Sequence, residues 1–492
     1  MPDTKVFIGI LYYLVMEKKK KESGLKKEDS KKAYPIKIGL EVHGYLNTNE
    51  KLFCMCKTKP NGDEKEDKPN SRVCPICTGQ PGSKPMLPNS EALKKVIEVG
   101  LVLGCKINHD KKLVWQRKHY NWADLPKGYQ NTISGAYSVP VCENGSFMGV
   151  GITECHLEED PAQWNPDTGR VNYNRSGLPL IEIVTEPEFY DSIQVVEWLN
   201  ALLQSLSYIK AVRKNAGIKC DVNVSTYGER VEIKNVSSIE SIRQAIEYEV
   251  ERQIENYNQG IEQKRDTLSF DSIKGKTIKM REKESGEDYR FIPDPDLPII
   301  KIDEKLVKKL ENELPEMPEV KLEKLIKKYK LEKNDAEILA RNLELVEFVE
   351  ELDKHIKGDV KKYISWVTIE LLRILNYNKK TLEDVEILPK HLAELIEAVS
   401  KDEITVLAGK KIMNDFIPNS FSVREKGLIG KTSEGDIEKI VKGVIKDNGK
   451  VVDDYKNGNE KSLNFLIGEV MKKSDRRADF KVARELILKA IN

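Results

Sequence analysis

The chain has 492 residues, of which 39% are hydrophobic and 33% are charged, with a mean hydropathy of -0.51. These values exclude a chain that is disordered throughout, and a typical size of about 150 residues per domain predicts roughly three domains. The 81 basic and 80 acidic residues give a formal net charge of +1, which excludes a global positive field for nucleic acid, so any RNA contact must use local patches.

The first 33 residues are expected to form a disordered N-terminal extension. The apolar run "VFIGILYYLVM" precedes the lysine-rich "EKKKKESGLKKEDSKK", whereas a signal peptide has its positive residues first. The run is also too short to span a membrane, which takes about 20 residues. An upstream start codon ahead of Met16 explains it, and a short membrane-surface anchor is the alternative. Since no other segment is transmembrane in character, we expect a cytoplasmic protein without a membrane partner.

Residues 34–300 are predicted to form an α+β domain. Short runs with β-type alternation are interrupted by glycine, proline and asparagine turns. Two amphipathic helices are predicted at 191–212 and 241–260, the second with apolar residues at helical spacing and a stop at Gly260. Their expected role is to cover a sheet that is mainly antiparallel.

Two helical domains are predicted after the proline-rich and aspartate-rich break "DYRFIPDPDLPII". Residues 301–400 carry lysine, glutamate and leucine at helical period, which predicts a helical domain. Residues 401–492 are predicted to form a small helical tail domain, in which "SEGDIEKIVKGVIKD" begins with a Ser-x-x-Asp cap.

Four of the eight cysteines fall in two close pairs within 52–79. Cys-x-Cys and Cys-x-x-Cys, separated by a polar stretch, have zinc-ribbon spacing. Four thiolates close a tetrahedral site that suits Zn²⁺, so this ion would be structural, with free thiols or a redox pair as the alternatives. The predicted zinc ligands are Cys54, Cys56, Cys74 and Cys77. The scattered thiols are predicted to be buried, namely Cys105, Cys142, Cys155 and Cys220.

Alternation in several predicted strands places acidic side chains on a polar face. In "IKIGLEVHGYL" Glu41 and His43 share a face, and in "IKCDVNVST" Asp221 and Asn223 do so. "RVEIKNV" adds Lys234 together with a further glutamate in the same manner. Such faces are often only the solvated side of an antiparallel sheet, and that alternative stays open.

Two further runs favour a metal site on this face. Glu182 interrupts the apolar run "LPLIEIV", where a carboxylate is costly unless a cation or hydrogen bonds compensate it. "ECHLEED" groups four acidic residues around His156, a density of charge that a divalent ion would relieve. Oxygen ligands with one imidazole suit Mg²⁺ or Mn²⁺. Ion-pair networks leave the same pattern, so they remain the alternative.

The motifs for nucleotide and RNA binding are less specific than the paired cysteines and the acidic strands. "GLIGKTSE" lacks the glycine spacing of a P-loop, so ATP would need a metal and carboxylates on another framework. The segment 115–132 interleaves aromatic and basic residues, which suits stacking on unpaired bases, although burial of the aromatics against the sheet explains the pattern nearly as well.

Eight motifs in one order carry a resemblance to a known family. They are "IGLEVH", the paired cysteines, "DLPKGYQ", "HLEED", "NRSGLPLIEIVTEP", "CDVNVS", "EIKNV" and "YRFIPDPDLP". From about Ile36 to its end the chain resembles the B subunits of aspartyl/glutamyl-tRNA amidotransferases. The related archaeal E subunits carry a large insertion, for which "DLPIIKID" running straight into helical sequence leaves no room.

The resemblance implies a cradle-shaped catalytic domain, a helical domain and a tail that holds tRNA. It implies that ATP first phosphorylates the side-chain carboxylate of misacylated glutamyl- or aspartyl-tRNA and that ammonia then displaces phosphate. A partner A subunit would supply the ammonia from glutamine, and a small C subunit would hold the pair together. The alternative is a zinc-stapled subunit without catalytic function that positions tRNA for a catalytic partner.

The resemblance also implies roles for individual positions. The Mg²⁺ ligands of the family fall on His43, Glu159, Glu182 and Asp221, and Glu41 joins them as a catalytic residue. The zinc ligands fall on the four paired cysteines. Substrate contacts are expected from positions within the shared motifs, namely Lys127, Tyr129, Arg175, Asn223 and Lys234.

Overall fold

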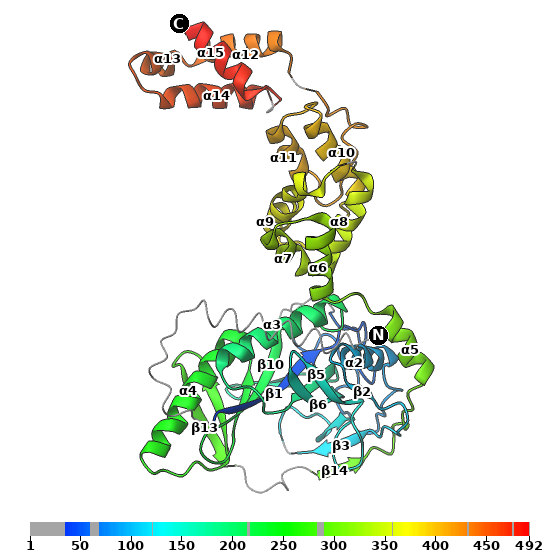
Figure 1. Cartoon of the computed structure of the whole chain (residues 1–492). Coiled ribbons are helices and arrows are strands. Elements are labelled where there is room, and N and C mark those ends of the chain that lie inside the picture. Colours follow the sequence, from blue (N-terminus) through cyan, green and yellow to red (C-terminus); the bar gives the residue numbers. More distant parts are fainter. Residues whose placement is uncertain are drawn as a thin grey trace. The chain divides into compact units, whose positions relative to one another are not determined.

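Figure 1 shows the computed structural model of the chain. It describes residues 35–59, 68–120, 122–213, 217–282, 290–356, 358–430, 432–474 and 477–491. The predicted extension over 1–33 lies outside these residues. The chain divides into two compact units, Met1–Pro315 and Glu316–Asn492, and this division falls later than the predicted boundary at residue 300.

The first unit is built on a large sheet. Its order is β13-β12-β11-β10-β1-β9-β6-β4-β3-β14, with β2 and β5 attached beside β6. Every pairing is antiparallel except that of β11 with β12. The strands are β1 (Lys37–Tyr45), β2 (Lys106–Ile107), β3 (Gln116–His119), β4 (Tyr129–Thr132), β5 (Cys142–Phe147), β6 (Val150–Glu159), β9 (Pro179–Thr185), β10 (Ile218–Ser225), β11 (Val231–Val236), β12 (Asp266–Asp271), β13 (Lys276–Glu282) and β14 (Arg290–Pro293). A separate pair consists of β7 (Gln163–Trp164) and β8 (Val171–Asn172).

Alternation along the central strand β1 separates an apolar face from a polar one. Ile38, Leu40 and Val42 are at most 1% exposed and belong to the core. Glu41 and His43, which alternate with them in sequence, line a cavity on the other face. The prediction that these two residues share a face is therefore confirmed, and the neighbouring strand β10 repeats the pattern.

Helices cover the apolar side of the sheet. Figure 1 shows α3 and α4 side by side over the strands that include β10 and β13. Each of the three long helices of this unit begins after an N-cap residue whose side chain accepts hydrogen bonds from backbone N–H groups of the first turn. These N–H groups have no acceptor within the helix itself. These helices and their caps are α2 (Ser90–Val102, Asn89), α3 (Ser192–Tyr208, Asp191) and α4 (Ile239–Asn258, Ser238). The two helices predicted from periodicity are confirmed; α3 is shorter than predicted, and α4 begins and ends two residues earlier.

The helix α5 (Glu304–Glu313) explains why the first unit extends beyond the predicted boundary. It packs against α2 and buries Val307 and Leu310. Its sequence is amphipathic like that of the helical domain, so the pattern alone assigns it to the wrong unit. None of the helices that the structure describes is long and apolar enough to cross a membrane.

The second unit is helical and contains two separate apolar cores. The first core runs from Leu325 to Val423 and the second from Ile437 to Ile491. The tail core therefore begins later than the predicted boundary at residue 401. The elements of the first core are α6 (Pro318–Tyr329), α7 (Lys333–Ala340), α8 (Leu343–His355), a π-helix η3 (Trp366–Leu371), α9 (Leu372–Tyr377), α10 (Pro389–Ser400) and α11 (Val406–Asn414), with short 3₁₀ turns at Val360–Lys362 and Leu382–Asp384. The tail consists of α12 (Glu434–Asp447), α13 (Gly449–Lys456), α14 (Lys461–Lys473) and α15 (Phe480–Ile491).

Candidate active site

A row of polar side chains crosses the centre of the sheet. His43 on β1 lies opposite Glu182 on β9, and Glu182 lies opposite His156 on β6. On the other side of β1, Glu41 lies opposite Asp221 on β10. Residues directly opposite each other in neighbouring strands project from the same face of a sheet. The register of four strands therefore gathers residues that are far apart in the sequence.

His43 joins two groups of potential metal ligands. Its Nδ1 lies 3.7 Å from Glu158 Oε1 and 3.8 Å from Glu182 Oε2. The ligand atoms of these three residues lie within 4.8 Å of one another, and so do those of Glu41, His43 and Asp221. His43 Nδ1 is shielded from solvent and has no hydrogen-bond partner among the described residues. Carboxylate oxygens with one imidazole form a donor set that hard divalent cations bind, so these residues fit such an ion.

Two partly buried carboxylates of this cluster differ in their charge environment. Burial raises the pKa of Glu41, and the negative charges of Glu182 and Asp221 raise it further. Burial also opposes ionisation of Glu182, but His156 and His43 outweigh it and lower the pKa of this carboxyl. His156 Nε2 lies 3.2 Å from Glu182 Oε2, and His156 Nδ1 lies 3.0 Å from Glu154. His156 on β6 therefore contacts the Glu182 carboxylate and fixes its direction.

Lys234 and Asn223 hold the carboxylates of the cluster that lie nearest to β10. Lys234 Nζ lies 2.5 Å from Asp221 Oδ2 and also pairs with Glu232. Burial opposes the charge of Lys234, but these two carboxylates outweigh it and raise its pKa. Asn223 Nδ2 donates to Glu41 Oε1 at 3.1 Å. These two predicted substrate residues thus contact the carboxylates of the cluster.

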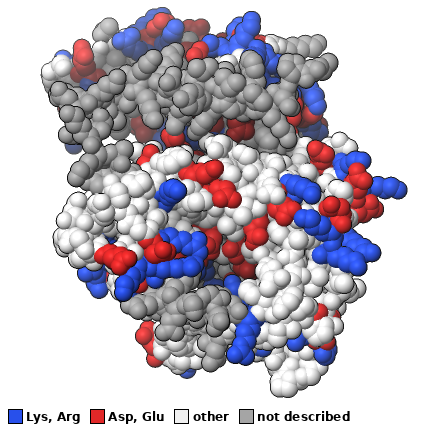
Figure 2. Space-filling model, turned by 60° about the horizontal axis from the view of Figure 1, so that its bottom comes forward, with Lys and Arg blue, Asp and Glu red and all other residues white. Residues whose placement is uncertain are grey.

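The cluster opens into a cavity of about 460 Å³. Figure 2 shows acidic side chains in the hollow at the centre of this face, with basic side chains close by. At one end of the cavity, Tyr45 Oη donates to Asp160 Oδ2 at 2.9 Å, and Arg175 Nε lies 2.8 Å from the same oxygen. Arg175, a predicted substrate residue, therefore lines the cavity with its guanidinium already paired to Asp160.

Glu159, one of the predicted magnesium ligands, has its side chain outside this cluster. Its Oε1 accepts from Lys127 Nζ at 2.5 Å and from the backbone amide of Asn131 at 2.9 Å. Successive residues of a strand point to opposite faces, so Glu158, and not Glu159, points toward His43. Glu158 is the acidic residue of "HLEED" that belongs to the cluster.

Lys127 and Tyr129 lie with Glu159, outside the residues that line the cavity. Lys127 Nζ is 4.8 Å from the centre of the Tyr129 ring, and the Arg117 guanidinium is 4.6 Å from the same ring. Burial raises the pKa of Tyr129 to about 12. The two residues predicted to contact substrate therefore form a packed network with Glu159 on the opposite side of β4 from the cavity.

The aromatic residues of 115–132 divide between the two roles that the sequence left open. Trp115 is buried and packs edge-on against the Phe53 ring at 5.0 Å. Tyr120 and Trp122 line the cavity, and Trp122 is 48% exposed. Burial thus explains one tryptophan, while the other is available to a ligand.

The four paired cysteines come together as predicted from their spacing. Their Sγ atoms lie within 4.8 Å of one another, a set that can bind a metal ion. A contact between Cys54 and Cys77 lowers the pKa of Cys77 and raises that of Cys54. Four sulfur donors this close together are the ligand set of a structural Zn²⁺ site. The four scattered cysteines are buried, as predicted.

Sequence reasoning missed several residues of the cavity. Glu158 could have been found, because it has the same strand parity as His156 and Glu154 in "ECHLEED". Asp124 carries no such pattern, whereas Lys118 is one of the basic residues of the segment 115–132, in which the sequence interleaves aromatic and basic residues. Lys118 lies on β3 and Asp124 in the connection between β3 and β4, and they reach the cavity only because the sheet places β4 beside β6 and β3 beside β4.

Comparison with known proteins agrees with this arrangement. Residues 36–308 match the family model described as "GatB/GatE catalytic domain", and residues 347–491 match the one described as "GatB domain". The chain belongs to the family of aspartyl/glutamyl-tRNA amidotransferase B subunits. The family resemblance inferred from the motifs is confirmed.

Relatives of the same family match nearly the full length. The chain is 40% identical over 459 residues to the aspartyl/glutamyl-tRNA(Asn/Gln) amidotransferase B subunit of Methanopyrus kandleri, covering 92% of this chain and 98% of the relative. The proteins of the same name from Methanococcus aeolicus and Methanocaldococcus jannaschii are each 41% identical. Those matches cover 93% and 92% of this chain, and 98% and 97% of the relatives. The chain is therefore a subunit of a tRNA-dependent amidotransferase.

Proposed function

We propose that the chain phosphorylates the side-chain carboxylate of misacylated glutamyl-tRNA(Gln) or aspartyl-tRNA(Asn) with ATP. Ammonia then displaces the phosphate and leaves the amide. In this proposal an A subunit releases the ammonia from glutamine, and a small C subunit holds the two larger subunits together. The chain thereby supplies the bond-forming site of a ligase that joins carbon to nitrogen.

The observation that carries this proposal is the position of His43 between two groups of carboxylates in one cavity. We assign the magnesium site to His43, Glu158, Glu182 and Asp221, with Glu41 beside them. A divalent cation bound there would neutralise phosphate charge and polarise the transferred phosphoryl group. The lysine side chains that line the same cavity add positive charge for a triphosphate.

The four paired cysteines are proposed to hold a structural Zn²⁺. All four positions of a tetrahedral site would be occupied by sulfur, so no position remains for water or substrate. The cysteine loops are also tied to the segment that precedes β9, because Ser176 Oγ donates to the Cys77 carbonyl at 2.7 Å and Leu52 N donates to the Gly177 carbonyl at 2.8 Å. The expected role is to hold these loops in place.

The test supplies ATP, Mg²⁺, free ammonium and misacylated tRNA to the chain, alone and with its A and C subunits. Ammonium bypasses glutamine hydrolysis, so amide formation reports the proposed chemistry alone. Glu182→Gln keeps the shape of the side chain but removes its charge and should abolish amidation while tRNA binding remains. Glu255→Gln on the exposed side of α4 is the matched control and should change neither.

Two outcomes would contradict the proposal. Parallel loss of amidation and tRNA binding in Glu182→Gln would assign this residue to folding. Intact tRNA binding without ATP-dependent product, even with both partner subunits present, would favour a subunit that only positions tRNA.

A further inference from the structure

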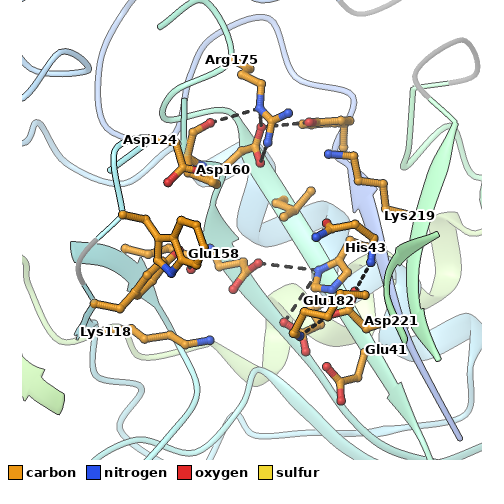
Figure 3. Close-up of a pocket in the computed structure, with 18 of the residues that line it drawn as sticks. Glu41, His43, Lys118, Asp124, Glu158, Asp160, Arg175, Glu182, Lys219 and Asp221 are labelled. Carbon is orange, nitrogen blue, oxygen red and sulfur yellow. Dashed lines mark hydrogen bonds and ion pairs between the residues drawn. The ribbon is translucent and has the colours of Figure 1, made fainter. Parts of the chain in front are cut away.

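Asp124 is an acidic residue at the end of the cavity away from the metal-type cluster. Figure 3 shows it beside Asp160 and Arg175, while Glu41 and Asp221 lie at the opposite end. It belongs to the connection between β3 and β4. Its Oδ1 is shielded from solvent and has no hydrogen-bond partner among the residues that the structure describes.

The neighbouring carboxylate shows what Asp124 lacks. Asp160 accepts from Tyr45 Oη at 2.9 Å and is paired with the Arg175 guanidinium at 2.8 Å. Arg175 Nε also donates to the Pro161 carbonyl at 3.2 Å. The charges of Arg175 and Lys219 favour the ionised form of Asp124, but neither side chain forms an ion pair with it among the described residues. No ion pair of Asp124 within 4 Å occurs in the described part of the chain, and burial raises its pKa. A shielded carboxylate of this kind is costly unless a cation compensates it, and in an open cavity that cation can be a ligand.

The substrate of the proposed function contains one such cation. An amino acid esterified to tRNA keeps its α-ammonium group, which is separated from the side-chain carboxylate by only a short carbon chain. When that carboxylate lies at the cluster around His43 and Glu182, the α-ammonium must lie elsewhere in the same cavity. Among the described carboxylates that line it, Asp160 is already paired, whereas Asp124 is not.

We propose that Asp124 binds the α-ammonium group of the misacylated amino acid and so directs its side chain toward the carboxylate cluster. This inference rests on the proposed function and adds the group that orients the substrate. It makes Asp124 a determinant of specificity for esters with a free α-ammonium.

The experiment compares two substrates in the complete complex with ATP, Mg²⁺ and ammonium. One is glutamyl-tRNA, and the other is the same tRNA carrying a glutaryl ester, which has hydrogen in place of the α-ammonium and adds no bulk. The wild-type complex should use the glutaryl ester with a kcat/KM about ten- to a hundredfold lower, the range for a hydrogen bond between charged groups. Asp124→Asn should lower kcat/KM by a similar factor with glutamyl-tRNA, mainly through KM, and should leave the glutaryl value unchanged.

Asp110→Asn, in an exposed turn outside the cavity, is the matched control and should change neither value. Thermal unfolding of both variants verifies that they fold. Equal use of the two esters by the wild type would overturn the inference, as would an equal loss with both esters in Asp124→Asn. A wild-type complex that amidates neither ester would overturn the proposed function, and this inference with it.

Discussion

Gly79, in the loop that follows the second cysteine pair, should be the most sensitive glycine of the cysteine cluster. It has a φ of +64°, and a Cβ at this position would lie 2.5 Å from the carbonyl oxygen of Pro126. Gly82, three residues later, has a φ of +84° but no atom within 4 Å of the corresponding Cβ. Alanine at either position adopts the left-handed conformation at a cost of about 1–2 kcal/mol. Only Gly79→Ala also creates a steric overlap, which typically costs about 1–3 kcal/mol.

The difference between the two variants therefore isolates the close approach of the cysteine loop to the Pro126 segment. We expect Gly79→Ala to lower the free energy of unfolding by about 1–3 kcal/mol more than Gly82→Ala does. Urea unfolding followed by tryptophan fluorescence measures this difference in the free energy of unfolding, because every tryptophan except Trp366 lies in the first unit. Equal losses in the two variants would refute the reasoning, since the shared backbone strain would then account for the whole effect.

Three further predictions concern the metal cluster, an ion pair and the tail. Cys77→Ser should remove about one bound zinc per chain by elemental analysis and lower the melting temperature, whereas unchanged zinc content would contradict the proposed site. Burial acts to raise the pKa of Asp294, but Arg117 outweighs it and lowers this pKa by donating hydrogen bonds of 2.9 and 3.0 Å. The ion pair therefore stabilises the fold above about pH 4, and this stabilisation is lost as the pH falls further. Asp294→Asn should thus cost about 3 kcal/mol at pH 7, and urea titrations should find that this deficit shrinks below pH 4. Leu466→Ala, in the tail core, should cost about 3 kcal/mol and speed hydrogen exchange in α12 and α15 but not in β1; protection lost equally in β1 would contradict separate cores.

Much of the site follows from local pattern. The alternation of β1 and β10 places Glu41, His43 and Asp221 on polar faces because successive strand residues point to opposite sides. The spacing of the paired cysteines predicts a four-sulfur cluster for an equally local reason, since two short loops can each present two thiols. The order of the motifs identifies the family.

Other features depend on contacts between distant segments. Periodicity alone does not reveal that α5 packs on α2, so the first unit ends later than the sequence suggests. Strand parity separates Glu158 from Glu159, but only the placement of β6 beside β9 in the sheet brings Glu158 close to His43.

The sequence by itself thus determined which strands carry polar faces, where the sulfur ligands lie and which family the chain belongs to. The tertiary structure decided which polar faces meet, which carboxylates are already paired with a cation and which, like Asp124, are not. The physical reason is the range of the interactions. Alternation and helical period arise from neighbouring residues, whereas burial and ion pairing depend on strands and loops that only the completed sheet brings together.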